Sequence, residues 1–422
     1  MLLTGNSTEP ELAFLPWDLS LEQWSEDLVV ALPRGISRHV VRFVRINGRV
    51  YAVKEIEQYY ASREYALLHE LLGRDVPTVS PVAVISDRID VHGEPLPSAL
   101  ITEHLKFSLP YRALFSSSLR LDTASRLLDA LAVLLVQLHL AGFSWNDCSL
   151  SNTLFRRDAG AFAAYLVDAE TGELHEKLSD GQRAYDLETA ATNVAGELLD
   201  LQAGGRLHEG IDPIEVGVSL HSRYEKLWDE LKRTLVISRA DRFELEAQIR
   251  RLNELGFDVA ELQVTTGPEQ DQVVLTPKVV DPGHHMRRLL RLTGIDAEEQ
   301  QARRLLNDLD SYRYKIESGP DDEEFAAHRW VNDRFEKVME KVPYDMRRKL
   351  EPAQIFHEVL EHRWFMSERA GSSVKFEDAV DDYIENVLAK KPDEQSVLGA
   401  RVGNANDTTQ ELLLHLPHED EC

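Results

Sequence analysis

The residues best suited to chemistry lie in segment 145–155, which reads Trp-Asn-Asp-Cys-Ser-Leu-Ser-Asn-Thr-Leu-Phe. It places Asp147 five positions before Asn152, and an apolar run follows. A second apolar run ends in Asp168, sixteen positions after Asn152, and Lys54 lies upstream within a strand-like run. A phosphoryl-transfer site requires this set in this order. The lysine binds phosphates, the first aspartate acts on the acceptor hydroxyl, and the asparagine and second aspartate hold Mg²⁺.

Lys54 needs a carboxylate that fixes its side chain in the direction of the phosphates. Glu64 lies near the start of the helix predicted after the Lys54 strand, and we expect it to be that partner. Glu70 is the second candidate, but six residues further along a helix it lies on a different face. Because an ordinary surface lysine on an edge strand would show the same local sequence, the assignment depends on the other members of the set.

A loop that could cover nucleotide phosphates is expected at residues 33–40, between two predicted strands. Backbone N–H groups near Gly35 and Ser37 would provide the contacts, with help from the Arg38 side chain. The loop has one glycine and lacks the G-x-G-x-x-G pattern, and a single glycine in a hairpin usually marks only a turn.

The polar loop residues also have simpler interpretations, because a single Asp or Asn in a loop is commonly a turn former. The order of Asp147, Asn152 and Asp168, each at a predicted strand or helix edge, favours catalysis over three separate turns. Glu170 could contact a second metal, but we expect it to be solvated. Asp186 is expected to cap the helix that it opens.

Composition excludes some classes of protein. The 47 basic and 73 acidic side chains give a net charge of -26, which argues against a nucleic-acid partner because phosphate backbones are bound by clustered positive charge. Two distant cysteines, Cys148 and Cys422, form no disulfide framework and favour a reducing compartment. The first ten residues do not resemble a signal peptide, and the apolar run 127–140 falls short of a bilayer span. We therefore expect a cytoplasmic protein without a membrane span.

The pattern of apolar residues predicts a β-rich lobe followed by mostly helical structure. Residues 1–105 form the β-rich lobe, with a lead-in in which Trp17 and Trp24 pack on the body, and residues 106–238 form a helical lobe that carries the catalytic loop. Residues 239–390 form an α+β and then helical accessory domain, and residues 391–422 form a disordered acidic tail.

Strands are predicted at 28–32, 40–44, 50–54, 82–85, 99–102, 153–155, 164–167, 257–265 and 272–280. Helices are predicted at 61–72, 122–141, 186–201, 213–236, 239–255, 283–294, 296–314, 325–342, 354–370 and 376–388. Asn47-Gly48 predicts a type I′ hairpin.

These motifs together resemble the protein-kinase-like superfamily over about residues 28–236. Val-Tyr-Ala-Val-Lys54 is similar to the VAIK strand, Asp147 to Asn152 to the H-R-D-x-x-x-x-N loop, and Leu-Val-Asp168 to the D-F-G strand end. The resemblance implies an α+β bilobal kinase-like fold, here followed by a mainly helical C-terminal accessory domain, with ATP and Mg²⁺ as cofactors. It also implies that Asp186 braces the catalytic loop.

The departures from the protein-kinase pattern point to an atypical branch. Trp145-Asn146 replaces His-Arg, Ala169-Glu170 replaces Phe-Gly, and the stretch from Asp168 to the next helix is short. These features are similar to lipopolysaccharide core (Kdo and heptose) kinases, Rio kinases and aminoglycoside phosphotransferases. The C-terminal half resembles a domain of unknown function from an uncharacterised, mainly actinobacterial family, through segments 309–313 and 357–364.

The sequence thus predicts an ATP- and Mg²⁺-dependent phosphotransferase that acts on a hydroxyl acceptor, either a small molecule such as a sugar or an atypical protein substrate. One alternative is a pseudokinase scaffold that binds a nucleotide and holds a protein partner through its C-terminal helices. The other is a kinase-fold transferase that moves the adenylyl group.

The segment 357–364 also contains the spacing H-E-x-x-E-H, at His357, Glu358, Glu361 and His362. It differs from the zinc motif H-E-x-x-H because a glutamate stands where the second histidine would be. A charged helix with i,i+4 pairs and a buried Trp364 is the favoured interpretation.

Overall fold

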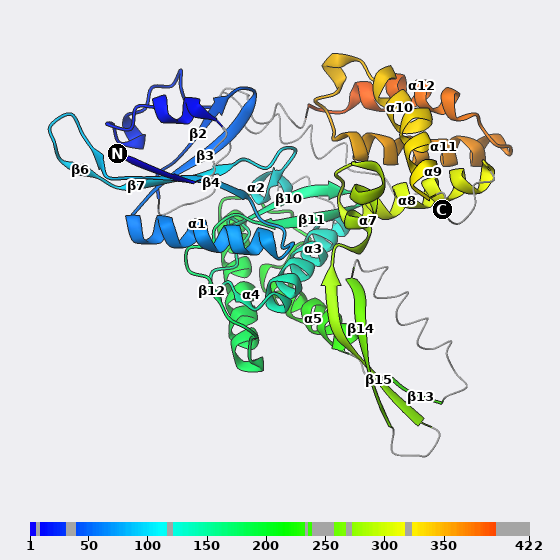
Figure 1. Ribbon diagram of the computed structural model, residues 1–422, viewed down its shortest axis with the longest axis horizontal. Coiled ribbons are helices and arrows are strands. Elements are labelled where there is room, and N and C mark those ends of the chain that lie inside the picture. The colour runs from blue at the N-terminus through cyan, green and yellow to red at the C-terminus, as the bar shows by residue number, and fades with distance from the viewer. Residues whose placement is uncertain are drawn as a thin grey trace. The chain divides into compact units, whose positions relative to one another are not determined.

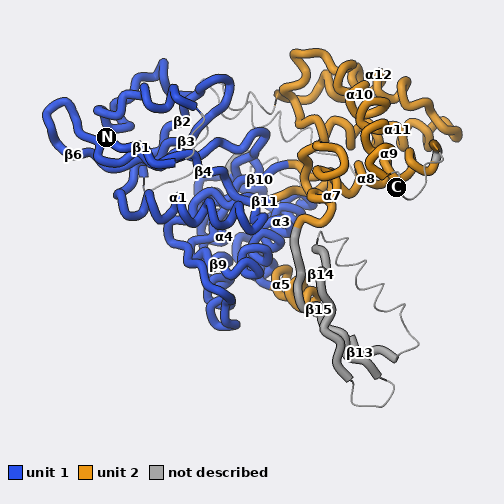
Figure 2. Tube along the Cα trace, viewed as in Figure 1, with its two compact units in different colours: residues 1–156, 164–221, 394–422 blue, residues 157–163, 222–393 orange. Residues whose placement is uncertain are grey.

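The computed structural model describes residues 1–5, 9–30, 39–115, 121–232, 235–238, 257–266, 272–316 and 323–393. The described residues form two compact units (Figure 2). The first holds residues 1–156 and 164–221, and the second holds residues 157–163 and 222–393. The four-part division with boundaries near 105, 238 and 390 stays a prediction. The helix predicted at 239–255 and the tail beyond residue 393 lie outside the described residues.

The first unit begins with a five-stranded antiparallel sheet in the spatial order β1-β4-β7-β3-β2 (Figure 1). Its strands are β1 (Leu2–Gly5), β2 (Val41–Ile46), β3 (Arg49–Ile56), β4 (Ser80–Ser86) and β7 (Ser98–Glu103), and a small hairpin of β5 (Arg88–Ile89) and β6 (Pro95–Leu96) lies between β4 and β7. Helix α1 (Gln58–Gly73) follows β3 and packs on β4 and β7. Four predicted strands and the predicted helix are confirmed. Of the strand predicted at 28–32, the described part contains only a bridge from Val29 to Val44.

The turn between β2 and β3 confirms the predicted hairpin type. Asn47 and Gly48 both have positive φ, at 50° and 80°, as a type I′ turn requires. This turn sets the register that pairs Val41 with Lys54, and so fixes which face of the sheet Lys54 occupies.

The lead-in packs on the sheet, as predicted. Trp17 and Trp24 are buried and meet edge to face at 5.3 Å between ring centroids, in a core that includes residues of β2, β3, β4 and β7. The Arg88 guanidinium is also buried and donates hydrogen bonds to the carbonyl oxygens of Trp17 and Leu19 and to the Glu55 carboxylate, at 3.1, 2.6 and 2.9 Å. Because these bonds satisfy the buried charges, the lead-in is an integral part of the sheet.

The rest of the first unit is mostly helical and carries short strands near the predicted chemistry. Its elements are β8 (Leu109–Pro110), α2 (Tyr111–Leu114), α3 (Leu121–Leu140), β9 (Phe143–Ser144), the start of β10 (Thr153–Asp158), the end of β11 (Ala161–Leu166), β12 (Glu173–Leu174), α4 (Asp180–Ala203) and the start of α5 (Pro213–Lys232). Helix α5 ends four residues before the predicted helix end, and β13 follows it. By length and composition α3 could cross a membrane, but 67% of its apolar window is buried in the fold, as in a core helix.

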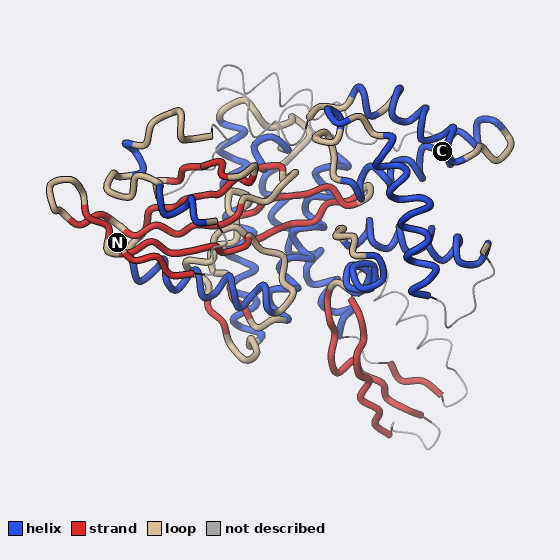
Figure 3. The backbone as a smooth tube through the Cα atoms, turned by 45° about the horizontal axis from the view of Figure 1, so that its top comes forward, coloured by secondary structure: helices blue, strands red, loops and turns tan. Residues whose placement is uncertain are grey.

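The second unit combines a three-stranded antiparallel sheet with a helical bundle (Figure 3). The sheet has the order β13-β15-β14, and its strands are β13 (Leu235–Ser238), β14 (Phe257–Thr266) and β15 (Gln272–Pro282). The helices are α7 (His284–Thr293), α8 (Glu299–Lys315), α9 (Glu323–Trp330), α10 (Glu336–Lys341), α11 (Pro352–Ala370) and α12 (Phe376–Asn386). A π-helical turn, Val331–Phe335, joins α9 to α10. The single helix predicted at 325–342 is therefore two α-helices connected by this π-helical turn. The core of the bundle is built around Trp330, Phe335 and Phe356.

The tip of the β10–β11 hairpin belongs to the second unit. Asp158 accepts hydrogen bonds from the backbone N–H groups of Gln300 and Gln301, at 3.0 and 2.7 Å, and so caps the start of α8. The Gln301 side-chain amide Nε2 donates a hydrogen bond to the backbone carbonyl of Arg157 at 2.9 Å. Burial, together with the nearby Glu298 charge, raises the pKa of Asp158 to about 8.

The H-E-x-x-E-H segment of α11 forms structural contacts. The mostly buried Glu358 accepts hydrogen bonds from Lys391 Nζ at 2.9 Å and from the Tyr383 hydroxyl at 2.8 Å, and burial lowers the pKa of His357 to about 4. Trp364 is 53% exposed, so the expectation that it is buried was wrong. Within the described ranges, the acidic and histidine side chains of this segment do not gather into a group that could hold a metal ion.

Candidate active site

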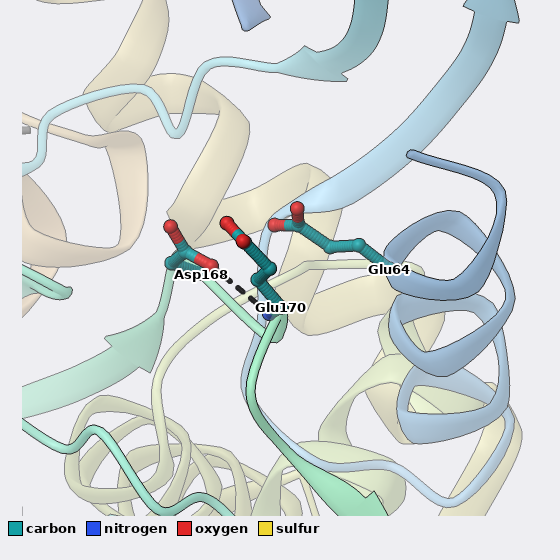
Figure 4. A group of neighbouring side chains, drawn as sticks. All are labelled: Glu64, Asp168 and Glu170. Carbon is teal, nitrogen blue, oxygen red and sulfur yellow. Dashed lines mark hydrogen bonds between the residues drawn. The ribbon is translucent and has the colours of Figure 1, made fainter. Parts of the chain in front are cut away.

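Lys54 is surrounded by three carboxylates in the first unit. Its Nζ lies 2.7 Å from Asp168 Oδ2, 3.1 Å from Glu64 Oε2 and 3.1 Å from Glu170 Oε2. Figure 4 shows Glu64 reaching from α1 towards the two acids that follow β11, and the three acids offer oxygen atoms within 4.8 Å of one another. Glu64 shares the buried face of α1 with Ala61 and Leu68, which explains why this acid, at 1% exposure, points into the fold.

The charges in this cluster do not balance. Burial alone would lower the pKa of Lys54, but the Glu64 and Asp168 carboxylates raise it above its ordinary value. Burial works against the ionisation of Asp168, yet the Lys54 charge holds the pKa of Asp168 below its ordinary value. Burial and the Asp168 charge raise the pKa of Glu64 to about 8. Even with a proton held on Glu64, two carboxylates, those of Asp168 and Glu170, lie beside the single charge of Lys54, and this is an environment that favours binding of a cation.

Glu170 belongs to this cluster, so the expectation that it is solvated was wrong. Its carboxylate also meets His39 Nε2 at 2.8 Å, and its side chain is 14% exposed. Arg63, next to Glu64 on α1, donates to the backbone carbonyls of Glu170 and Gly172, the latter at 2.5 Å. Both contacts join segments more than a hundred residues apart, so no local sequence pattern could predict them.

Asp147 and Asn152 lie together in the loop after β9. Asn152 Nδ2 donates to the Asp147 backbone carbonyl at 3.0 Å and to Asp147 Oδ2 at 3.3 Å. Asn193 Nδ2 approaches Asp147 Oδ1 at 3.4 Å and donates to the Cys148 carbonyl at 3.2 Å. Because the amide nitrogen of Asn152 is directed to Asp147, the amide oxygen of Asn152 is the atom that could bind a cation.

Asp186 braces this loop from within α4. Its fully buried carboxylate accepts hydrogen bonds from the backbone N–H groups of Trp145 and Asn146, both at 2.7 Å, and from His139 Nε2 at 3.0 Å. The brace implied by the kinase resemblance is therefore present. The predicted cap is wrong, because α4 begins at Asp180 and Ser179 caps it through a capping box with Gln182.

Two further residues that position the loop were not identified from the sequence. The Glu197 carboxylate accepts a hydrogen bond from the Leu150 backbone N–H at 2.7 Å. It also accepts hydrogen bonds from the backbone N–H and the hydroxyl of Ser151. A signal for Glu197 and Asn193 does exist. At 100° per residue, both lie within about 20° of Asp186 around α4, and so form one polar stripe along an edge of the buried apolar face of this helix.

The indole of Trp145 connects the loop to the metal-ligand candidates. Its Nε1–H donates to the Asp168 backbone carbonyl at 2.8 Å, and the Thr171 hydroxyl donates to the Trp145 carbonyl at 3.1 Å. A tryptophan at the position of a kinase histidine thus has a defined role, since it ties the Asp147 loop to Asp168.

A cavity of about 470 Å³ opens beside the lysine cluster. Lys54, Glu64, Asn152 and Asp168 line it, whereas Asp147 is not among the lining residues but accepts a hydrogen bond from Asn152. The apolar lining includes Val41, Ala52, Val79, Leu100, Leu154 and Val167. The volume and the mixed lining suit a small molecule with an apolar part and an anionic part. Gly35 and Ser37, predicted to cover phosphates, lie outside the described residues.

Comparison with known proteins identifies two regions in the chain. Residues 41–193 match the lipopolysaccharide kinase (Kdo/WaaP) family, and residues 226–388 match a domain of unknown function, DUF4032. These matches confirm the predicted resemblance and the predicted fold class, a kinase-like region followed by a mainly helical region. A solved structure described as WaaP in complex with acyl carrier protein is similar over 60% of this chain and 99% of its own, at 18% identity and a TM-score of 0.34. A search of the curated proteins finds no match.

Proposed function

We propose that the kinase-like region catalyses ATP- and Mg²⁺-dependent phosphoryl transfer to a hydroxyl acceptor. The observation that carries this proposal is that Lys54 contacts both Glu64 and Asp168 at the polar end of a cavity that Asn152 also lines. The match of residues 41–193 to a kinase family supports it independently.

The donor set suits magnesium, which prefers oxygen ligands. Asp168 and Asn152 would hold the ion, and Glu170 offers another carboxylate in the same cluster. The excess negative charge around Lys54 supports this assignment, because a divalent cation would neutralise it. When bound, Mg²⁺ would offset charge on the phosphates of ATP.

The remaining steps depend on the chain's own side chains. Lys54, held by Glu64, would orient the phosphates through its ammonium group. Asp147, held by Asn152 and Asn193, would accept the proton of the acceptor hydroxyl or orient that hydroxyl for attack. Most of the rate enhancement would come from positioning and from electrostatic stabilisation of the transferred group.

The acceptor is better explained as a small molecule than as a peptide. Helix α4 begins at Asp180, only twelve positions after Asp168, so the chain is short where a protein kinase carries its activation segment. A small hydroxylated acceptor needs no long docking platform, and a sugar is one candidate within this class.

Two other functions remain candidates on specific observations. A kinase-fold adenylyl transferase would use the same lysine and metal ligands. A pseudokinase scaffold is favoured by Trp145 in place of the kinase histidine, and the helical second unit would then hold a protein partner. The complete set of Lys54, Asp147, Asn152 and Asp168 favours the enzyme over the scaffold.

Labelled ATP distinguishes these functions. The protein is incubated with Mg²⁺, a small-molecule cell extract and ATP labelled at either the α or the γ phosphate. We expect transfer of label only from the γ position, and a loss of at least about 100-fold in Asp147→Ala. Asp180→Ala, an exposed aspartate on α4, is the matched control and should retain activity. Transfer from the α position would indicate an adenylyl transferase, and nucleotide binding without any transfer would indicate a scaffold.

A further inference from the structure

We propose that the second unit positions the metal ligands of the first, because it holds the tip of the β10–β11 hairpin, and the base of that hairpin carries Asn152 and Asp168. The inference rests on the proposed function, since it assumes that these two residues bind Mg²⁺ together with ATP. It makes positioning residues of Asp158 and Gln301, which do not line the cavity and do not belong to the phosphoryl-transfer motifs.

The two strands of the hairpin connect the metal ligands to the second unit directly. Strand β10 begins at Thr153, the residue after Asn152, and β11 ends at Leu166, two residues before Asp168. The tip between them, residues 157–163, belongs to the second unit (Figure 2). The six residues from Asn152 to the start of the tip turn span roughly 20 Å at about 3.3 Å per residue. A displacement of the tip therefore acts on both ligands through continuous, hydrogen-bonded strands.

The base of the hairpin keeps the two ligands side by side, but it does not fix the direction of the strands. The Val167 backbone N–H donates to the Asn152 carbonyl at 3.0 Å, which places the residue before Asp168 beside Asn152. Within the described ladder, β8 pairs only with Leu154 and Phe155 of β10, so the outer half of the hairpin is a two-stranded ribbon. Two-stranded ribbons twist more than wider sheets, and the twist of this one depends on how its tip is held.

The turn at the tip needs support from outside the hairpin. Ala159 and Gly160 both have positive φ, at 51° and 81°, as in a type I′ turn. Alanine is uncommon in this left-handed region, because its Cβ comes too close to the backbone, and asparagine or glycine is usual there. A side chain of α11 stabilises the turn, since the Ala159 N–H donates to Gln354 Oε1 at 3.2 Å.

Polar side chains at the starts of α8 and α11 bind the rest of the tip. Gln301 Nε2 donates to the Arg157 carbonyl and to Gln354 Oε1, each at 2.9 Å, and the Asp158 carboxyl caps α8. Asp158, Gln301 and Gln354 are at most 4% exposed. Because a buried polar group that loses its partner is costly, the tip and the starts of these two helices move as one body.

Two cations provide a readout that separates positioning from a purely structural role. Mg²⁺ requires nearly ideal octahedral coordination at about 2.0–2.1 Å, whereas Ca²⁺ accepts a flexible arrangement at about 2.3–2.6 Å. A displaced pair of ligands therefore weakens the binding of Mg²⁺ more than that of Ca²⁺. A general loss of stability in the second unit would leave the ratio of the two affinities unchanged.

The test compares calorimetric titrations of the full chain with ATP, in excess Mg²⁺ and in excess Ca²⁺. Asp158→Leu removes the acceptors of the tip, and Gln301→Met removes the donor to the Arg157 carbonyl and is the milder change if the first variant does not fold. Asp158→Asn is the conservative variant. The pKa of Asp158 is raised to about 8, so its carboxyl is mostly protonated at neutral pH, and asparagine matches it in shape and keeps one acceptor.

We expect Asp158→Leu and Gln301→Met to weaken binding of ATP with Mg²⁺ about 2- to 30-fold, the range of coupling between distant sites in proteins. The loss with Ca²⁺ should be smaller, and Asp158→Asn should keep most of the affinity. Leu309→Ala is the matched control. Leu309 is fully buried on α8, eight residues and about 12 Å beyond Gln301, so its truncation destabilises the second unit without touching the tip. It should leave the ratio of the two affinities unchanged.

The possible results separate this inference from the proposed function. Thermal unfolding of each variant sets a temperature at which it is folded, and the titrations are made there. An unchanged affinity ratio in the folded tip variants, an equal change in Leu309→Ala, or failure of both tip variants to fold would mean that the tip acts only in folding, and would refute the inference while leaving the nucleotide site intact. If the unchanged protein does not bind ATP with Mg²⁺, the proposed function fails and the inference fails with it.

Discussion

Replacement of Asp186 by asparagine should destabilise the catalytic loop in a way that the structure allows us to estimate. The carboxylate accepts from two backbone N–H groups, of Trp145 and Asn146, and from the ring of His139. Asparagine has one acceptor oxygen, and its NH₂ group would face a donor. Asn146 also has a positive φ of 62°, an uncommon backbone conformation for a residue other than glycine, and these hydrogen bonds help to hold it.

The expected magnitude follows from what is lost. One hydrogen bond to a charged group contributes about 1.5–3 kcal/mol, and a buried N–H left without an acceptor costs about 1–3 kcal/mol. Since rotation of the amide relieves part of this, we expect a loss of about 3 kcal/mol in the free energy of unfolding. For a domain of 150–250 residues this corresponds to a midpoint that is roughly 6–12 °C lower. The displaced Asp147 should also reduce kcat about 100-fold, because small errors in position are costly.

Thermal unfolding and turnover are measured for Asp186→Asn beside Asp180→Asn. The control removes an aspartate from the same helix, but Asp180 is 89% exposed and forms an i,i+3 ion pair with Arg183, so its replacement should change stability by less than about 1 kcal/mol. Equal effects from the two variants would refute the idea that Asp186 positions the loop.

Three further predictions follow from the described contacts. Between about pH 4 and pH 8 the folded protein keeps a proton on Asp158, whereas the unfolded chain has released it. As pH rises through this range, Asp158 therefore lowers the free energy of unfolding by at most about 1.36 kcal/mol per pH unit. Urea unfolding at pH 5 and pH 8 should show that this dependence is absent in Asp158→Asn, and an unchanged dependence would contradict the assignment. A Cβ on Gly172 would lie 2.0 Å from Phe143 Cζ, so Gly172→Ala should cost about 1–3 kcal/mol in thermal unfolding, and full stability would disprove the close packing. Trp145→Phe removes the 2.8 Å hydrogen bond to the Asp168 carbonyl and should weaken calorimetric binding of Mg²⁺ and ATP, whereas unchanged affinity would show that this tie is unimportant.

Much of the fold was predictable because its signals are local. Strands β2 and β3 are rich in β-branched and aromatic residues and flank Asn47-Gly48, and the two positive φ angles show that the turn residues were interpreted correctly. The missed strand β1 is only four residues long and lies at the sheet edge, too short for an alternating pattern. The start of α4 was missed although Ser179 and Gln182 form a capping box, a signal present in the sequence.

The candidate site was predictable in part, because several of its members follow from motif spacing but its electrostatics do not. The order of Lys54, Asp147, Asn152 and Asp168 follows from motif spacing, and the structure brings Lys54, Asn152 and Asp168 to one cavity. The burial of Glu170 depends on Lys54, 116 residues earlier in the chain, so no local pattern contains it. Contacts between distant segments of this kind require the tertiary structure.

Nucleotide-dependent thermal stabilisation tests the central claim most directly. The midpoint of unfolding is measured with ATP, with Mg²⁺ and with both, for the unchanged protein and for Asp168→Asn. At a ligand concentration of 100 Kd, binding contributes about 2.7 kcal/mol, which is roughly 5–11 °C. We predict that rise only when ATP and Mg²⁺ are both present, and its loss in Asp168→Asn. No rise in the unchanged protein, or an equal rise in the variant, would contradict the assignment of Lys54, Asn152 and Asp168 to a metal-nucleotide site.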